Sequence, residues 1–171
     1  MLKRIENIEK IHYSSSMPRP EKERRVLQPP VIHDFKPTGI PKRFLESLEL
    51  SLDEYEAIRL TDYLGYDHGH AAEEMAISRP TFTRLVEKAR QKMAIFLVEG
   101  VHLKIEGGTI HFQENLMRCQ DCRNVFAIAL ASGVEKCPSC GSTKVVDLAA
   151  HFGHGNCCEP GGKQPNDHPV Q

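Results

Sequence analysis

The chain has 171 residues and a formal net charge of −1, with 40% hydrophobic and 26% charged residues, which is typical of one globular domain or two small ones. No run of 18 apolar residues occurs, so the composition excludes a protein with a transmembrane helix. The first sixteen residues lack the apolar core of a secretory signal, and we therefore expect a cytoplasmic protein without a membrane partner.

The sequence divides into five stretches of different composition. We expect an N-terminal extension, a Pro-rich basic arm, a helix-turn-helix domain with a β-hairpin, a zinc-ribbon-like module, and a disordered tail rich in His, Cys and Gly. In chain order these stretches are residues 1–16, 17–42, 43–112, 117–148 and 149–171. The predicted fold class is therefore mainly α, with a small β module near the C-terminal end.

Helical periodicity appears first in the extension and then in the central block. In the extension, apolar residues recur every third position and predict a weak amphipathic helix. They are Leu2, Ile5, Ile8 and Ile11. In the central block, a helix is predicted to begin at Ser51 or Asp53 and to end at Gly65. Its apolar positions are Tyr55, Ile58, Leu60 and Leu64.

Charged and titratable side chains on these helices have a plain structural interpretation. We expect Asp53, Glu54 and Glu56 to form the solvated face of their helix, where first-turn carboxylates suit the helix dipole. His68 and His70 are expected at surface or capping positions of the next helix. No nucleophile elbow, phosphate-binding loop or dinucleotide fingerprint occurs in the sequence. The sequence therefore does not predict an enzyme.

Two further helices are predicted, a short one over residues 68–75 and a longer one after Ser78. Ser78 is a suitable N-cap, and Pro80 is tolerated in the first turn because its missing N–H would have no partner there. The longer helix carries one continuous stripe of apolar residues that we expect to be buried. These are Phe82, Leu85, Val86, Ala89, Met93, Phe96 and Leu97.

The spacing of these two helices is that of a helix-turn-helix. Ala72 is small enough for a close helix contact, the turn follows at Ala76, and Ile77 is the first apolar anchor after it. The turn position favours glycine because its φ tends to be positive. An alanine there costs about 1 kcal/mol.

The outward face of the longer helix is basic and carries hydroxyl groups. Arginine can fork onto guanine O6 and N7, and threonine can meet a phosphate or a thymine methyl group. The predicted DNA contacts on this face are Ser78, Arg79, Thr81, Thr83, Arg84 and Lys88. Arg19, Arg24 and Arg25 of the arm are predicted to follow phosphates or the minor groove. The alternative is a three-helix bundle whose basic face is only solvated.

Five segments of the chain follow a recognisable order: MPRPEKERRV (17–26), F-x-P-x-G-I-P (35–41), DEYEAIRLTDY (53–63), AAEEMAISRPTFTRLVEKARQKMA (71–94) and LKIEGG (103–108). Together they resemble the DUF134/UPF0251 family, whose DNA-binding role is inferred. Residues 50–93 also resemble sigma factor region 4, which reads promoter DNA. The resemblance covers about residues 17–112 and implies a transcriptional regulator that binds double-stranded DNA. The extension before Met17 and the alanine at the turn depart from the family pattern.

Residues 101–112 have the alternation of two strands. Val101, Leu103 and Ile105 share one face, and Gly107-Gly108 permits a tight turn before the segment 109–112. This pattern predicts a β-hairpin.

Two matched cysteine pairs, Cys119-x-x-Cys122 and Cys137-x-x-Cys140, predict a metal site. In a chain without an export signal, cysteines are more often metal ligands than disulfide partners. Four thiols in two knuckles favour one tetrahedral structural Zn²⁺. A β-ribbon is predicted between the knuckles from the alternation of Phe126, Ile128 and Leu130. Some thirty residues bury too little core to fold alone, so the metal would supply the missing free energy. A rubredoxin-like iron site and a redox dithiol are the alternatives.

The remaining His and Cys residues leave a second function class open. His151, His154, Cys157 and Cys158 form a candidate second metal site without an evident scaffold. The main prediction is sequence-specific binding of double-stranded DNA, with RNA polymerase and a second copy of the chain as further candidate partners. The alternative is a metal-handling protein, or an adaptor that docks onto RNA polymerase or another protein.

Overall fold

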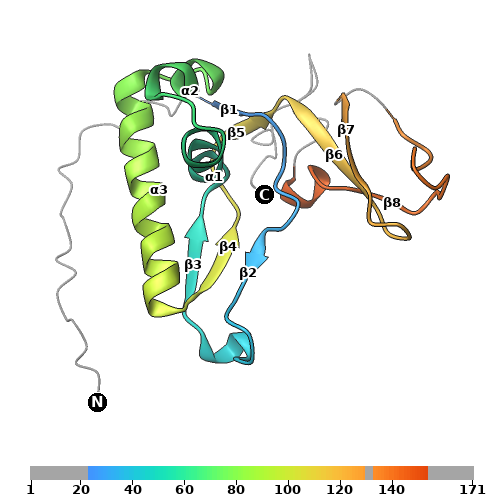
Figure 1. The fold of residues 1–171 in the computed structure, drawn as a ribbon, viewed down its shortest axis with the longest axis horizontal. Helices are drawn as coiled ribbons and strands as arrows, with labels where there is room; N and C mark the ends of the chain where they lie inside the picture. Colours follow the sequence, from blue (N-terminus) through green and yellow to red (C-terminus); the bar gives the residue numbers. More distant parts are fainter. Residues whose placement is uncertain (1–22, 130–132, 154–171) are drawn as a thin grey trace, which may run out of the picture.

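The computed structural model describes residues 23–129 and 133–153 (Figure 1). The predicted helix over residues 1–16 lies outside the described residues. Within them the chain has three α-helices and eight β-strands, and the strands form three small sheets. The prediction of a mainly α fold is therefore wrong, because short strands between and after the helices build a mixed α and β structure.

The three predicted helices of the central block are present. They are α1 (Leu52–Ile58), α2 (His68–Glu74) and α3 (Arg79–Glu99), and a π-helical turn at Arg59–Tyr63 continues α1. Helix α1 begins after Ser51, whose N–H donates to Glu54 Oε2 at 2.9 Å. Helix α3 begins after Ser78, whose Oγ accepts from the Thr81 N–H at 3.3 Å. The predicted caps at both residues are confirmed.

The buried stripe of α3 is shorter than predicted. Phe82, Leu85, Val86 and Ala89 are buried, and Met93 and Phe96 pack against the core beyond them. The prediction for Leu97 is wrong, because its side chain is 74% exposed. Phe96 in the same turn packs against the core, so Leu97 lies beyond the edge of the apolar stripe and faces solvent.

Two sheets belong to the main body and one to the cysteine region. The first has the order β2-β4-β3, made of β2 (Asp34–Phe35), β4 (His102–Ile105) and β3 (Ser47–Leu50). The second pairs β1 (Arg24–Val26) with β5 (Ile110–Phe112) in parallel. The third has the order β7-β6-β8, made of β6 (Glu114–Cys119), β7 (Val125–Ala129) and β8 (Val145–Asp147). This third sheet lies on the opposite side of the molecule from α3 (Figure 1).

The predicted hairpin over residues 101–112 is wrong, although both of its segments contain strands. Both edges of β4 are already occupied, by β3 in parallel and by β2 in antiparallel orientation. Gly107 and Gly108 have positive φ and turn the chain away, and the Gly107 carbonyl accepts from the Leu52 N–H at 3.1 Å. Strand β5 therefore leaves β4 and pairs with β1.

The core consists of two neighbouring apolar clusters. One joins the small sheets of the body to the middle of α3 through Leu50, Leu103 and Ala89. The other joins α1 and α2 to the first turns of α3 through Ala57, Ala72 and Phe82. Helix α3 contacts both clusters, so its position is fixed along most of its length.

Candidate nucleic-acid interface and metal centre

Helices α2 and α3 are joined by a short turn that the sequence predicted in detail. Ala71 and Ala72 of α2 are buried against Phe82 and Val86 of α3. Ala76 has φ of 54°, the left-handed conformation expected at this position. Asp67 caps α2 by accepting from the Gly69 N–H at 2.8 Å. The turn thus sets the angle between the two helices and leaves the opposite face of α3 uncovered.

Replacing Ala76 with glycine should stabilise the protein by about 1 kcal/mol. Alanine at φ of 54° carries a steric cost that glycine does not have. For a chain of this length, the change corresponds to a rise in melting temperature of about 3 °C.

A matched control is Ala94→Gly, because Ala94 is exposed inside α3. It should destabilise by about 1 kcal/mol through the low helix propensity of glycine. Thermal unfolding of both variants tests the turn geometry. A melting temperature that falls for Ala76→Gly as it does for Ala94→Gly would contradict it.

The predicted DNA-contact residues of α3 do not all have the same surroundings. Ser78, Arg79, Thr81, Arg84 and Lys88 are exposed. Thr83 is half-buried, and its hydroxyl lies 3.0 Å from His68 Nδ1. The structure therefore places five of these six side chains on the open surface of one helix and ties the sixth to α2.

The predictions for Asp53, Glu54 and Glu56 as a solvated face are wrong. These side chains are only 4%, 0% and 2% exposed. Asp53 is ion-paired with Arg24 of β1, and Glu56 with Arg59 at 2.7 Å. The sequence Ser51-x-x-Glu54 is a capping-box pattern and was the available signal that Glu54 turns back toward the helix start.

Glu54 connects α1 to α3 through two lysines. Lys88 Nζ lies 3.0 Å from Glu54 Oε1, and Lys92 Nζ lies 2.6 Å from Oε2. Burial alone raises the pKa of the Glu54 carboxyl, but Lys92, the Ser51 N–H and Lys88 together hold that pKa below its ordinary value. Glu54 is therefore a buried carboxylate whose charge is needed to hold α3.

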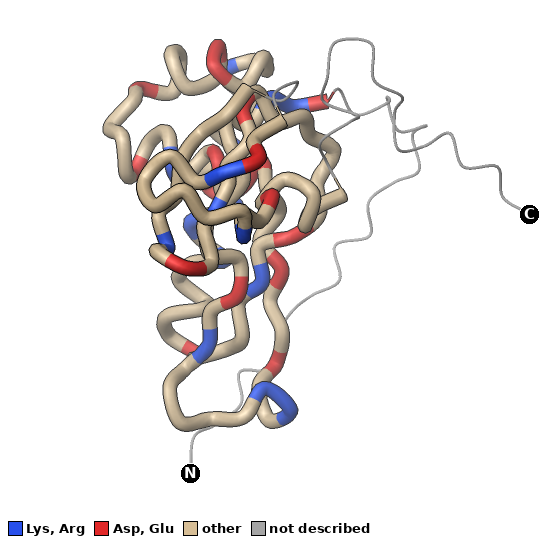
Figure 2. Tube along the Cα trace, turned by 90° about the vertical axis from the view of Figure 1, so that its right-hand side faces the viewer, with Lys and Arg blue, Asp and Glu red and all other residues tan. Residues whose placement is uncertain are grey.

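Charge is segregated along the sequence, since residues 44–62 hold six acidic residues and one basic residue, whereas residues 78–92 hold five basic residues and one acidic residue. Folding brings these two segments together. The acidic segment 44–62 contacts the basic segment 78–92 through Glu54, and again where Asp62 accepts from Arg90 at 2.6 and 3.1 Å. Figure 2 shows acidic and basic residues interspersed over the body of the protein. Part of the basic stripe of α3 is consequently neutralised inside the protein.

Replacing Glu54 with glutamine should destabilise the protein at pH 7 by about 2 kcal/mol, because two ammonium groups lose their carboxylate. The folded pKa is the lower one, so the carboxylate contributes stability above the unfolded pKa of about 4.3. That contribution is lost as the pH falls through the folded pKa, and the penalty of the variant should shrink with it.

Urea unfolding of wild type and Glu54→Gln at neutral and at acidic pH measures this penalty. The control is Glu99→Gln, because Glu99 is exposed at the end of α3. It should cost little at either pH. An equal penalty for Glu54→Gln at both pH values would contradict the assignment.

A cavity of about 440 Å³ lies beside the exposed face of α3. Thr81, Arg84 and Lys88 line it from α3, and Arg24 and Thr109 from the body. The polar face of α3 therefore lies across this cavity from strand β1 and the turn before β5. Any polyanion lying on α3 would therefore meet this part of the body as well.

The predicted basic arm is integrated into the fold where the structure describes it. Arg24 is partly buried by its contact with Asp53, whereas Arg25 is exposed on β1. Val26, Pro29 and Pro30 are buried. Arg19 lies outside the described residues.

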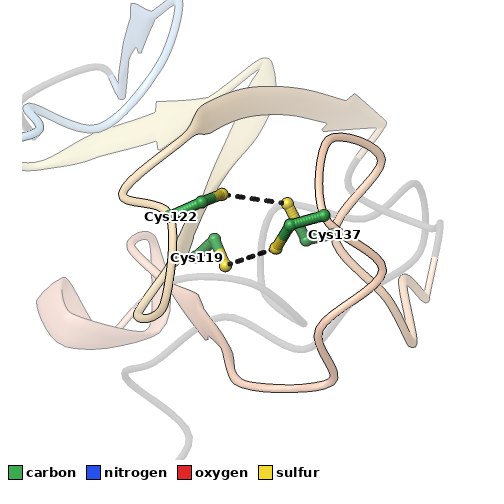
Figure 3. Close-up of side chains that lie close together, drawn as sticks. Cys119, Cys122 and Cys137 are labelled. Carbon is green, nitrogen blue, oxygen red and sulfur yellow. Dashed lines mark hydrogen bonds between the residues drawn. The ribbon is translucent and has the colours of Figure 1, made fainter.

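The four paired cysteines lie together at the end of the third sheet. Their sulfur atoms are all within 4.8 Å of one another. Cys119 and Cys140 are 3.6 Å apart, and Cys122 and Cys137 are 3.7 Å apart (Figure 3). A tetrahedral ion with sulfur ligands at about 2.3 Å has edges of about 3.8 Å. The cluster could therefore hold one metal ion.

The two cysteine knuckles share one backbone geometry. The Cys119 N–H donates to the Asn124 carbonyl at 2.9 Å, and the Cys137 N–H donates to the Ser142 carbonyl at 2.8 Å. The residue after each second cysteine has positive φ, 61° at Arg123 and 71° at Gly141. Two equivalent turns therefore present two sulfurs each to a common centre.

The electrostatics of the cluster favour a cation. Backbone N–H groups of Cys122 and Asp121 lower the pKa of Cys119 to about 6. The Ser142 N–H lowers the pKa of Cys140, but the neighbouring thiols outweigh it and raise this pKa to about 12. The sulfurs are thus so close that all four cannot be ionised without a positive charge among them.

The module between the knuckles also has the predicted strand. Phe126 and Ile128 lie in β7, which pairs with β6, and Leu130 lies outside the described residues. Asp121 of the first knuckle accepts from Ser142 of the second at 2.7 Å.

Of the candidate second metal site in the tail, the structure describes only His151. Its ring contacts that of His33 with centroids 4.0 Å apart. The other candidate ligands of the tail, His154, Cys157 and Cys158, lie outside the described residues.

Comparisons with known proteins agree with the sequence resemblance. The family model described as "Protein of unknown function DUF134" matches residues 14–113. A UPF0251 protein of Chloroherpeton thalassium is 48% identical over 136 residues, which is 80% of this chain and 90% of the relative. UPF0251 proteins of Pelotomaculum thermopropionicum and Halothermothrix orenii are 44% and 41% identical, over 74% and 75% of this chain and 95% and 98% of their own.

No solved structure matches the chain significantly. Among the helices of the described residues, none combines the length and the apolar character needed to cross a lipid bilayer.

Proposed function

The chain belongs to the DUF134 family, and for this member we propose that it binds double-stranded DNA through a helix-turn-helix formed by α2 and α3. The observation that carries the proposal is the exposed start of α3. Arg79, Thr81 and Arg84 lie on its first two turns, and the buried residues of α2 pack on the opposite side. An α-helix fits the major groove, and the first residues of a recognition helix read base edges.

The predicted contacts then divide by role. Arg79 and Arg84 suit guanine, because each guanidinium can donate twice to O6 and N7. Ser78 and Thr81 lie at the start of α3, where hydroxyl groups meet phosphate or base edges. Lys88 and Arg25 are phosphate contacts, since both are exposed and basic. Thr83 contacts His68 and Arg24 is ion-paired with Asp53, so these two residues hold the DNA-facing surface in place and do not contact DNA themselves.

We further propose Zn²⁺ as the ion of the cysteine cluster. Four thiolates in two knuckles with tetrahedral spacing are the donor set of structural zinc sites. The proposed role of the chain is regulation of transcription in the cytoplasm. It is a binding role without catalysis.

Selection of bound fragments from random duplex DNA tests the proposal. We expect the selected fragments to share one sequence, and that sequence to bind at least 1,000-fold more tightly than unrelated duplex, as specific regulators do. Selection that enriches no shared sequence would contradict sequence-specific binding. A plain bundle with a solvated basic face would give that result.

A further inference from the structure

Most polar side chains on the two flanks of α3 are already bonded inside the protein. On one flank, Lys88 and Lys92 contact Glu54 of α1. On the other flank, Arg90 is bonded to Asp62, and Thr83 lies against His68. These contacts fix the rotation of α3 about its own axis. The Lys88 side chain is still 65% exposed, so its ammonium can contact a phosphate as well as Glu54.

Between the two flanks runs a line of three polar side chains, Arg84, Glu87 and Gln91. They are spaced three and four residues apart, so they share one face of the helix. All three are exposed. In the part of the chain that the structure describes, none of the three forms a side-chain hydrogen bond or an ion pair. This line is the outermost part of α3 and directly opposes its buried stripe.

Glu87 is the unexpected member of this line. A carboxylate on a DNA-facing helix is repelled by phosphate, so in a complex with DNA it is stabilised only where a group donates a hydrogen bond to it. Base edges supply such groups in the major groove, where cytosine N4 is a donor that glutamate accepts from. Arg90, three residues further along the helix, is hydrogen-bonded to Asp62 and interacts with Glu87 only through a weaker coulombic attraction.

We propose that Glu87 is a specificity-determining residue that accepts a hydrogen bond from cytosine N4. This inference rests on the proposed DNA binding and adds the base that one side chain reads. Glu87 is three residues, or about 4.5 Å, further along α3 than Arg84. Base pairs are stacked about 3.4 Å apart. The two side chains therefore reach the same or neighbouring base pairs, with Arg84 on guanine and Glu87 on cytosine.

The test uses the full chain, the duplex selected by wild type, and duplexes in which each base pair is replaced in turn. Wild type should lose about 5- to 150-fold in affinity when the cytosine read by Glu87 is replaced. Glu87→Gln should lose less than about 3-fold at that position and keep the wild-type discrimination elsewhere. Glu87 is exposed and unbonded, so the variant should unfold at the wild-type temperature.

Glu99→Gln is the matched control, because it removes the same charge from the far end of α3. It should keep discrimination at every base pair. If Glu87→Gln also keeps wild-type discrimination at every position, the assignment of Glu87 is overturned while DNA binding stands. If wild type selects no shared sequence, the proposed function is overturned and this inference with it.

Discussion

Replacing Cys140 with serine should lower the zinc affinity of the cysteine cluster by orders of magnitude. The variant keeps three sulfurs and leaves one position of the tetrahedron open, and a structural site needs all four ligands. The remaining sulfurs belong to Cys119, Cys122 and Cys137, which the structure holds within 4.8 Å of one another. Mass spectrometry after mild chelation should find one zinc per chain in wild type and little in the variant.

The control is a chain that ends at Gly153 and lacks the three later candidate ligands, His154, Cys157 and Cys158. It should keep one zinc per chain. The end point follows Phe152 because that ring packs against the core of the body. A full equivalent of zinc in Cys140→Ser, or its loss from the shortened chain, would show that the tail and not the cluster binds the ion.

Loss of the metal should also lower the stability of the body of the protein. After β8 the chain bonds to the start of β6, where the Leu148 N–H donates to the Leu116 carbonyl at 2.9 Å and the Ala149 N–H to Asn115 Oδ1 at 3.1 Å. Ala149 is fully buried in the same cluster as Ala89 of α3. At the other end of the module, the Glu114 N–H donates to the Leu27 carbonyl at 2.8 Å. The cysteine module is therefore joined to the body at both of its ends.

Replacing both Arg79 and Arg84 with alanine should cost about 2–6 kcal/mol in affinity for the selected duplex. Each guanidinium that forks onto guanine is worth about 1–3 kcal/mol, and the two contacts are far enough apart to add approximately. Both side chains are exposed, so the double variant should keep the stability of wild type. Titration of labelled duplex measures the affinity, and thermal unfolding checks the fold.

Lys88→Ala is the comparison variant for this experiment. A phosphate contact has no base preference, so its loss should weaken all duplexes alike and reduce the salt slope by about 1. Lys92, whose Nζ lies 2.6 Å from Glu54 Oε2 in the wild-type structure, should still pair with Glu54 in this variant. If the double arginine variant binds the selected duplex like wild type, α3 is not the reading helix.

The helices and the cysteine site were predictable because their signals are local. Ser78 and Gly65 marked a helix start and a helix end, and the turn at Ala76 followed from the spacing of small and apolar residues. Likewise, the two cysteine pairs carry their own turn geometry in a few residues. In each case the residues that specify the structure are close neighbours in the sequence.

The strand pairing could not be read in the same way. Val26 pairs with Phe112 and Leu50 with Ile105, and no local pattern connects residues so far apart in the sequence. The alternation in residues 101–112 predicted strands, but their partners depend on the whole fold. Glu54 was misplaced for a related reason, since its partners Lys88 and Lys92 lie on another helix.

The salt dependence of binding to the selected duplex tests the central claim most directly. Each phosphate contact releases condensed counterions, so the logarithm of affinity should fall linearly with the logarithm of salt concentration. With the two charged phosphate contacts proposed here, Lys88 and Arg25, affinity should drop about 10-fold between 50 and 200 mM salt. An affinity that does not change over this range, or no retention of duplex at the lower salt, would contradict DNA binding by α3.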